Sequence, residues 1–275
     1  MLESLQLFID GFELFRSAVY AALLAGFVLG AIGTYIAAQR IVFVSAALSQ
    51  TSSLGVVCAL FFHQYLHSHS VLLAPSLWAF LLSFLAILYL SRTKDRDALL
   101  GVIFIVGSAG TIIISSKIVE ELGDATSLLF GSAVAVPDEK LSALAWVLGL
   151  IFVLHLWWFR GFLSVSLDPL GAKTRGLPDK LLQIVLMGSI ALAIGETTRV
   201  LGAMPAFAFS VIPGLIGVSL SKTFKNAFVL AAIIGASGGG LGYILAYLFE
   251  YPVGATQSTF LALLYLISLF FSKRR

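Results

Sequence analysis

A run of small polar residues from Ser45 to Gly55 interrupts a stretch that is otherwise apolar enough for a membrane helix. The flanking residues 41–44 and 56–62 are apolar. On a helix, the serines of this run fall on one side, with Gln50 at its edge. Polar side chains in hydrocarbon lack water, so they usually face a protein interior or an aqueous path. The first candidates for contact with a polar solute are therefore Ser45, Ser49, Gln50 and Ser53.

Helix packing is the alternative interpretation of the same residues. Small side chains let helices approach closely, and a serine hydroxyl can bond to a carbonyl one turn earlier. Both interpretations stay open for the serines. Because an unpaired amide in lipid is costly, Gln50 is the more distinctive candidate for lining or gating a path.

Three of the four histidines, His63, His67 and His69, cluster just beyond this segment. Neutral imidazoles are zinc ligands, so these residues are weak candidates for a metal site. Neither a cysteine nor an acid completes a ligand set nearby, and exposed loop histidines are the favoured interpretation. His155, next to Trp157 and Trp158, is expected to anchor its helix at the membrane interface.

Several enzyme classes have no motif in this chain. The phosphate-binding loop, the serine nucleophile elbow and the paired histidines of zinc proteases are all missing from the sequence. The chain is therefore not expected to hydrolyse ATP by itself, and we expect no enzyme activity, no cofactor and no nucleic-acid partner. Glu196 lies near the outer end of its span, and Arg199 follows at the spacing of a local ion pair.

Composition identifies the elements that must hold these residues. The chain of 275 residues is 59% hydrophobic and 11% charged, against about 25% charged in soluble domains. Nine apolar windows are long enough to cross about 30 Å of hydrocarbon. The sequence thus predicts an all-α, polytopic membrane bundle that forms a single domain over residues 1–275. The windows are 16–38, 41–63, 70–91, 97–116, 141–159, 181–197, 202–220, 227–249 and 256–272.

The distribution of basic residues predicts the orientation. With a cytoplasmic C-terminus, 13 of the 17 lysines and arginines fall in cytoplasmic segments, which the positive-inside rule favours. The N-terminus is then outside, and residues 1–15 are expected to form an amphipathic segment on the outer surface. Residues 117–140 are expected to form a short interfacial or re-entrant helix on the same side.

The cytoplasmic connection 160–180 contains its own helix signals. Asp168 followed by Pro169 is typical of a helix start, and Gly176 and Pro178 indicate its end. A short helix of about two turns is expected there. Elsewhere, the pair Gly26 and Gly30 and the cluster 235–242 favour close helix contacts, and Pro205 and Pro213 are expected to interrupt the seventh span.

Four stretches make the sequence resemble the permeases of zinc and manganese ABC importers. These are residues 33–40 with 45–55, Ser127–Gly131, Asp168–Gly176, and the last third with Leu201–Ala203, Ile212–Pro213 and Tyr251–Ala255. The matches run in order across nearly the whole chain. The resemblance implies a homodimer in the bacterial inner membrane, with cytosolic ATP-binding cassette subunits that bind ATP, an external solute-binding protein, and contact with membrane lipid. It places ATPase coupling at Asp168, Ala172 and Gly176.

The sequence departs from this family at its usual metal ligands. The family carries an aspartate and a histidine one turn apart in the second helix, and this chain has Ala46 and Gln50 there. An amide is a poor zinc ligand. The solute is expected to be zinc, manganese or a metal chelate, on a path along the dimer axis or beside the helix with Pro213. A non-transporting scaffold or sensor and an ion-coupled carrier are the alternatives.

Overall fold

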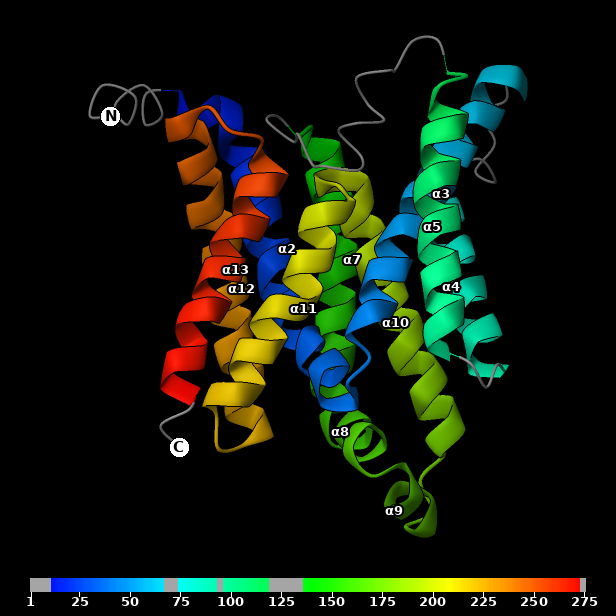
Figure 1. Ribbon diagram of the computed structural model, residues 1–275, viewed down its shortest axis with the longest axis vertical. Helices are drawn as coiled ribbons and strands as arrows, with labels where there is room; N and C mark the ends of the chain where they lie inside the picture. Colours follow the sequence, from blue (N-terminus) through cyan, green and yellow to red (C-terminus); the bar gives the residue numbers. More distant parts are fainter. Residues whose placement is uncertain (1–10, 67–73, 93–95, 119–135, 273–275) are drawn as a thin grey trace.

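The computed structural model describes residues 11–66, 74–92, 96–118 and 136–272, and these residues contain helices and no strands (Figure 1). The helices are α2 (Phe12–Gln39), α3 (Val42–Leu66), α4 (Pro75–Arg92), α5 (Arg96–Ser115), α7 (Asp138–Trp157), α8 (Phe159–Leu167), α9 (Pro169–Thr174), α10 (Asp179–Leu201), α11 (Ala203–Leu220), α12 (Phe224–Phe249) and α13 (Val253–Ser272).

The predicted membrane bundle is confirmed. Eight of the described helices are long and apolar enough to cross a membrane, and α4 adds a shorter apolar helix over Pro75–Leu90. Their order matches the nine predicted windows. The first helix begins at Phe12, about one turn before the predicted window, and therefore includes the end of the expected surface segment 1–15.

Helix α2 lies at the centre of one half of the bundle and packs most extensively against α12 and α11. A Cβ atom added at Gly26 would lie 2.1 Å from the carbonyl oxygen of Gly235 on α12. Only a residue without a side chain allows two backbones to approach so closely. The expected role of Gly26 and of the glycine cluster on α12 is therefore confirmed.

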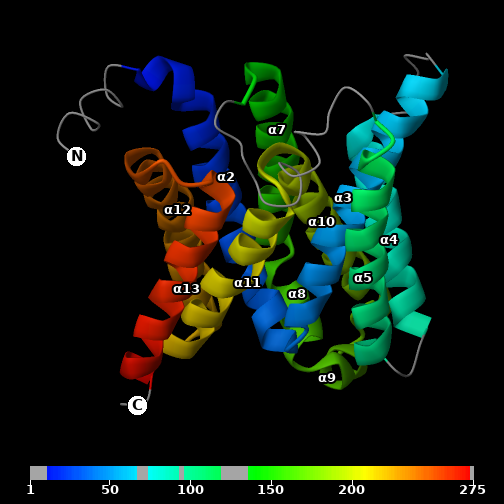
Figure 2. The same ribbon diagram turned by 45° about the horizontal axis from the view of Figure 1, so that its top comes forward.

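The other half of the bundle contains α3, α4 and α5, with α10 packed against α3 and α4. Both views show these helices on the opposite side of the molecule from α12 and α13 (Figures 1 and 2). The short helices α8 and α9 lie at the end of the bundle where α13 also ends, and α2 begins at the opposite end (Figure 1).

The expected interruption of the seventh span is wrong. Helix α11 runs without a break from Ala203 to Leu220, with Pro213 inside it and Pro205 in its first turn. Proline at the start of a helix costs no hydrogen bond, because the first amides have no partner within the helix. Pro213 is buried, in a helix whose backbone contacts α2 at Gly214, so neighbouring helices support it.

The connection 160–180 contains the predicted short helix and one more. Helix α9 begins after Asp168 and ends before Gly176, whose φ of +77° suits glycine, as the sequence predicts. Helix α8, which precedes it, was not expected. Its apolar residues follow those of α7 closely, so the sequence gives no clear boundary between them.

Several predictions fall on residues outside the described ranges. These are the amphipathic segment over residues 1–10, the histidines His67 and His69, and most of the outer connection 117–140.

The contact between α2 and α12 predicts the effect of one added methyl group. We expect Gly26→Ala to lower the free energy of unfolding by about 1–3 kcal/mol, because the methyl group meets backbone that cannot rotate away. Thermal unfolding of the purified protein in detergent measures this change. The control is Gly149→Ala on α7, where an added Cβ meets nothing within 4 Å. Equal unfolding temperatures for the two variants would contradict the prediction.

Candidate functional site

The polar run of the second span lies on α3, and its serines are buried inside the protein. Helix α3 packs against α4, α5, α10 and α11, so the run faces protein on several sides. Its hydroxyls fall into two groups, those with a hydrogen-bond partner and those without.

The hydroxyls with partners form hydrogen bonds within α3 or link α3 to α4. Ser49 donates to the carbonyl of Ala46 at 2.9 Å, and Thr51 donates to the carbonyl of Ala47 at 3.0 Å. Ser52 and Ser83 of α4 share a hydrogen bond of 2.7 Å between their hydroxyls. For these residues the packing interpretation accounts for every hydroxyl. Ser49, a predicted path residue, therefore has a structural role in this conformation.

The remaining polar atoms are buried without a hydrogen-bond partner among the described residues. On α3 they are the hydroxyls of Ser45 and Ser53 and the Oε1 atom of Gln50. On α10 they are the hydroxyls of Thr197 and Thr198 and the Nε atom of Arg199. Further atoms of this kind lie on α2, α7 and α13, in Tyr35, His155 and Gln257. An unsatisfied buried polar group costs about 1–3 kcal/mol, so such atoms usually meet water or a ligand. Helices α3 and α10 are in contact nearby, because Gly195 of α10 lies against Ser52 of α3.

An ion pair adjoins the hydroxyls of α10. Arg199 donates to Glu196 one turn earlier, as the spacing predicts. The Glu196 side chain is only 3% exposed and that of Arg199 is 16% exposed. Each charge thus has the other as a partner inside the bundle, although the Nε atom of Arg199 is buried without a hydrogen bond among the described residues. The pair is thus more deeply enclosed than a surface pair, which sequence spacing alone does not reveal.

The described residues offer no ready metal centre. They contain no group of three or more histidine, cysteine, aspartate or glutamate side chains close enough to hold an ion. Ala46 is buried and supplies no ligand atom, and Gln50 supplies a neutral amide. The unpartnered atoms of α3 are neutral oxygen atoms, which suit a hydrated or chelated solute better than a bare soft metal ion, and the charged pair Glu196–Arg199 adjoins those of α10.

Pro213 is buried on α11, and its neighbour Gly214 packs against α2 instead of the α3 residues. Its helix, α11, does contact α3, but the adjoining Gly214 packs against the backbone of α2 at Gly33. The helix with Pro213 therefore lies beside α3, and the proline itself is packed inside the protein.

His155 is not an interfacial anchor, contrary to the expectation. Its side chain is fully buried, and Nδ1 lies 2.9 Å from the carbonyl oxygen of Ile151. The ring packs against Tyr35 of α2 and Phe162 of α8, at centroid distances of 5.6 and 5.0 Å. The prediction failed because α8 folds back under α7 and covers a position that the sequence places at a helix end.

The predicted coupling residues mark the start, the buried side and the end of α9. The carboxylate of Asp168 accepts a hydrogen bond of 2.8 Å from the amide of Gly171 and so caps the helix. Arg175 lies 3.7 Å from the same carboxylate and also donates to the carbonyl of Gly171 at 3.0 Å. Ala172 is fully buried against the bundle, and Gly176 ends the element. These contacts make α9 a small, rigid unit.

A chain of side-chain hydrogen bonds connects this region to the long helices. Gln39, the last residue of α2, donates to the hydroxyl of Ser166 on α8 at 3.0 Å. Gln183 of α10 donates to the Oε1 atom of Gln39 at 2.9 Å. The side chain of Gln39 therefore joins α8, α2 and α10, and a displacement of α8 would reach both long helices. Only the tertiary structure brings these three residues together.

An exposed leucine on α9 is a feature that the sequence analysis missed. Leu170 is 78% exposed and Leu167, just before the cap, is 60% exposed. These two bulky apolar side chains are exposed close together at the tip of a charged connection. The signal was present in the sequence as two leucines that flank Asp168 and Pro169.

The sequence matches known proteins over nearly its whole length. The model of the ABC 3 transport family matches residues 11–272. A protein of Haemophilus influenzae named a probable iron transport system membrane protein is 28% identical over 278 residues, covering 100% of this chain and 98% of the relative. The manganese transport system membrane protein MntC of Halalkalibacterium halodurans is 23% identical, covering 94% and 88% of the two chains.

The fold has a close counterpart among solved structures. A chain of PsaBC from Streptococcus pneumoniae, solved in complex with Fab, superimposes with a TM-score of 0.84. The two chains are 24% identical in sequence, and the match covers 96% of this chain and 95% of the other. The arrangement of helices described above is therefore shared with that protein.

The two groups of serines predict opposite effects of the same substitution. Ser45→Ala removes a hydroxyl without a partner, so we expect an unchanged or slightly raised unfolding temperature. Ser52→Ala breaks the bond to Ser83, so we expect a loss of about 1 kcal/mol in the free energy of unfolding. Thermal unfolding in detergent compares the two variants. A loss of stability in Ser45→Ala as large as that in Ser52→Ala would show that the Ser45 hydroxyl has a partner in the folded protein.

Proposed function

The chain belongs to the ABC 3 transport family, and we propose that it is the membrane-spanning permease subunit of an importer for a metal ion or a metal chelate. The observation that carries this proposal is the family match over residues 11–272, which includes every described membrane helix. The names of two relatives, an iron and a manganese transport protein, support a metal as the solute. The proposed solutes are manganese, iron or zinc, bare or chelated.

The proposed orientation places α9 and the end of α13 in the cytoplasm and the start of α2 outside, across the bacterial inner membrane. The end of the bundle that contains α9 also contains most of the described basic residues, as the positive-inside rule requires. They are Arg40, Arg160, Lys173, Arg175, Lys180, Lys222 and Lys225.

In this proposal a cytosolic ATPase subunit binds α9. The exposed Leu170 supplies apolar contact, and the Asp168 cap with its Arg175 partner keeps the helix rigid. ATP is bound by that subunit, since this chain has no phosphate-binding loop. Two copies of the chain form the transporter, and an external binding protein delivers the solute at the opposite end.

Transport proceeds by alternating access. Closure of the ATPase subunits displaces α9 and α8 as one unit, and Ser166, Gln39 and Gln183 pass that displacement to α2 and α10. The junction between α2 and α3 is short, with Arg40 in the left-handed conformation, so α3 follows the end of α2 closely. The hydroxyls on α3 and α10 that lack partners would then line the path that opens and closes.

A metal chelate is the second candidate for the solute. The specific observation in its favour is the neutral lining, with Ala46 and Gln50 at the positions where the resemblance leads one to expect an acid and a histidine. A chelate brings its own ligands and needs only hydrogen-bonding oxygen atoms from the protein, whereas a bare zinc ion needs ligands from the protein itself.

The contact with the ATPase can be tested at Leu170. We expect Leu170→Glu to reduce co-purification of the ATPase encoded beside this protein by at least tenfold, because it places a charge in an apolar contact. The control is Tyr251→Glu, at an exposed apolar side chain in the connection between α12 and α13, far from α9. Loss of the ATPase in both variants to the same extent, or in neither, would contradict a docking role for α9.

The solute can be tested by metal uptake. We expect cells that lack this protein to lose the uptake of one metal, measured by elemental analysis, and to recover it with the wild-type gene. The double variant Ala46→Asp/Gln50→His introduces a carboxylate and an imidazole one turn apart on α3. If α3 lines the path, we expect this variant to change the ratio of metals taken up.

Two results would contradict these assignments separately. Unchanged content of every metal in the deleted strain would exclude the importer function. Recovery by the double variant with the wild-type ratio of metals would leave the importer function intact and exclude α3 as the lining.

A further inference from the structure

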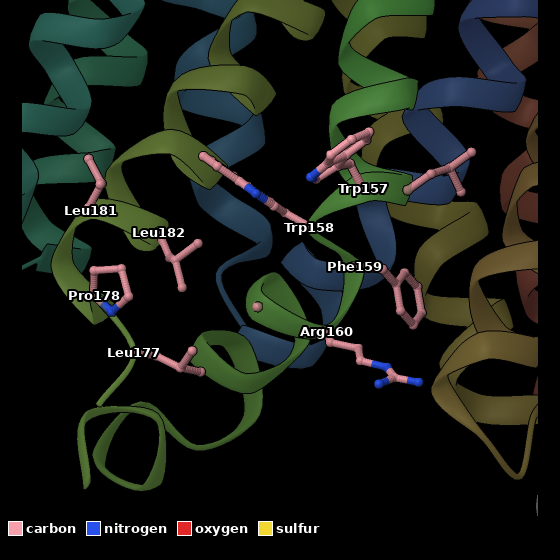
Figure 3. A pocket seen from close by; sticks show the side chains of 10 residues that line it. Trp157, Trp158, Phe159, Arg160, Leu177, Pro178, Leu181 and Leu182 are labelled. Carbon is pink, nitrogen blue, oxygen red and sulfur yellow. The ribbon is translucent and has the colours of Figure 1, made fainter. Parts of the chain in front are cut away.

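A groove lies at the α9 end of the bundle, between the junction of α7 with α8 and the start of α10. Its volume is about 540 Å³, and its walls come from residues 156–161 on one side and Leu177, Pro178, Leu181 and Leu182 on the other. Figure 3 shows Trp158 reaching from the junction toward α10 above Leu182, with Leu177 and Pro178 below. The groove therefore bridges the helices on both sides of α9.

The polarity of the groove changes along its length. Trp157, which is 83% exposed, and Leu156 and Leu181, both more than half exposed, provide apolar surface. Arg160 also lines the groove, and Figure 3 shows it below the two indoles, with its guanidinium directed away from Leu177 and Pro178. Tryptophan at the membrane interface with a basic side chain on its aqueous side matches the depth profile of a phospholipid, with acyl chain above and headgroup below.

The charge of the groove favours an anion. Arg160 has no acidic partner among the residues that the structure describes, whereas Arg175 is paired with Asp168. The connection 158–180 contains four basic and two acidic residues, so its net charge is positive. Basic pockets between membrane helices on the cytoplasmic side bind anionic headgroups.

We propose that this groove binds one anionic phospholipid of the cytoplasmic leaflet, with its phosphate on Arg160 and an acyl chain along Trp157, Trp158 and Leu181. The bound lipid braces α7 and α8 against α10 and so sets the position of α9. The choice of leaflet rests on the orientation in the proposed function, but the binding of the lipid does not depend on transport.

Quenching of tryptophan fluorescence by brominated lipids tests the site directly. The double variant Trp78→Phe/Trp146→Phe retains only Trp157 and Trp158 of the four tryptophans. In vesicles of unlabelled phosphatidylcholine, we add a small, equal fraction of brominated phosphatidylglycerol or brominated phosphatidylcholine. We expect about fivefold tighter association of the anionic lipid, the ratio given by about 1 kcal/mol for one basic residue at the surface.

Charge variants at Arg160 test whether this residue causes the preference for the anionic lipid. We expect Arg160→Gln to abolish the preference and Arg160→Lys to retain most of it. Lys222→Gln, which removes a basic residue at the same end of the bundle but outside the groove, should leave it unchanged. Equal quenching by the two lipids, or a preference that survives in Arg160→Gln, would overturn the proposal.

Measuring the quenching in the assembled transporter distinguishes a lipid from a protein as the occupant of the groove. We expect the quenching by phosphatidylglycerol to persist when the ATPase subunit is bound, since the acyl chain lies beside the membrane. Loss of quenching on assembly would overturn the proposal and assign the groove to the ATPase. A result of either kind is independent of the metal uptake assay, so the proposed function and the lipid site can fail separately.

Discussion

The contact between α2 and α12 is the interaction on which the rest of the structure depends. Backbone meets backbone at Gly26 and Gly235, with no side chain between the helices. Helices in a membrane gain little from the hydrophobic effect against one another, so their association relies on close packing of this kind. With α2 fixed at the centre, α11 and α12 can pack against one side and α7 against another.

Fixing α2 also fixes its C-terminal end, where Gln39 joins three helices. The amide bonds to Ser166 on α8 and to Gln183 on α10, so the short helices below the bundle are tied to a central helix and to a neighbour of α3. These bonds between side chains of different helices are part-buried. The same connection gives a motion that begins at α9 a direct route to the helices with buried, unpartnered hydroxyls.

The buried polar groups of α3 differ in whether they have a hydrogen-bond partner. Ser52 bonds to Ser83 and stabilises the contact of α3 with α4, whereas Ser45 and Ser53 find no partner. A stable membrane protein keeps few such groups, because each costs free energy unless water or solute compensates. Those on α3 and α10 support the path in our proposal, and the neutral amide of Gln50 supports the proposed chelated solute.

The sequence by itself determined the membrane helices, the start and end of α9, and the ion pair of Glu196 with Arg199. Each depends on residues that are neighbours along the chain, since apolar length, a capping carboxylate and a spacing of one turn are local properties. Only the tertiary structure decided which serines have partners, that His155 is enclosed by Tyr35 and Phe162, and that α11 continues through Pro213. These outcomes depend on side chains from distant segments, such as Ser83 for Ser52, and no local pattern specifies which helix will lie beside another.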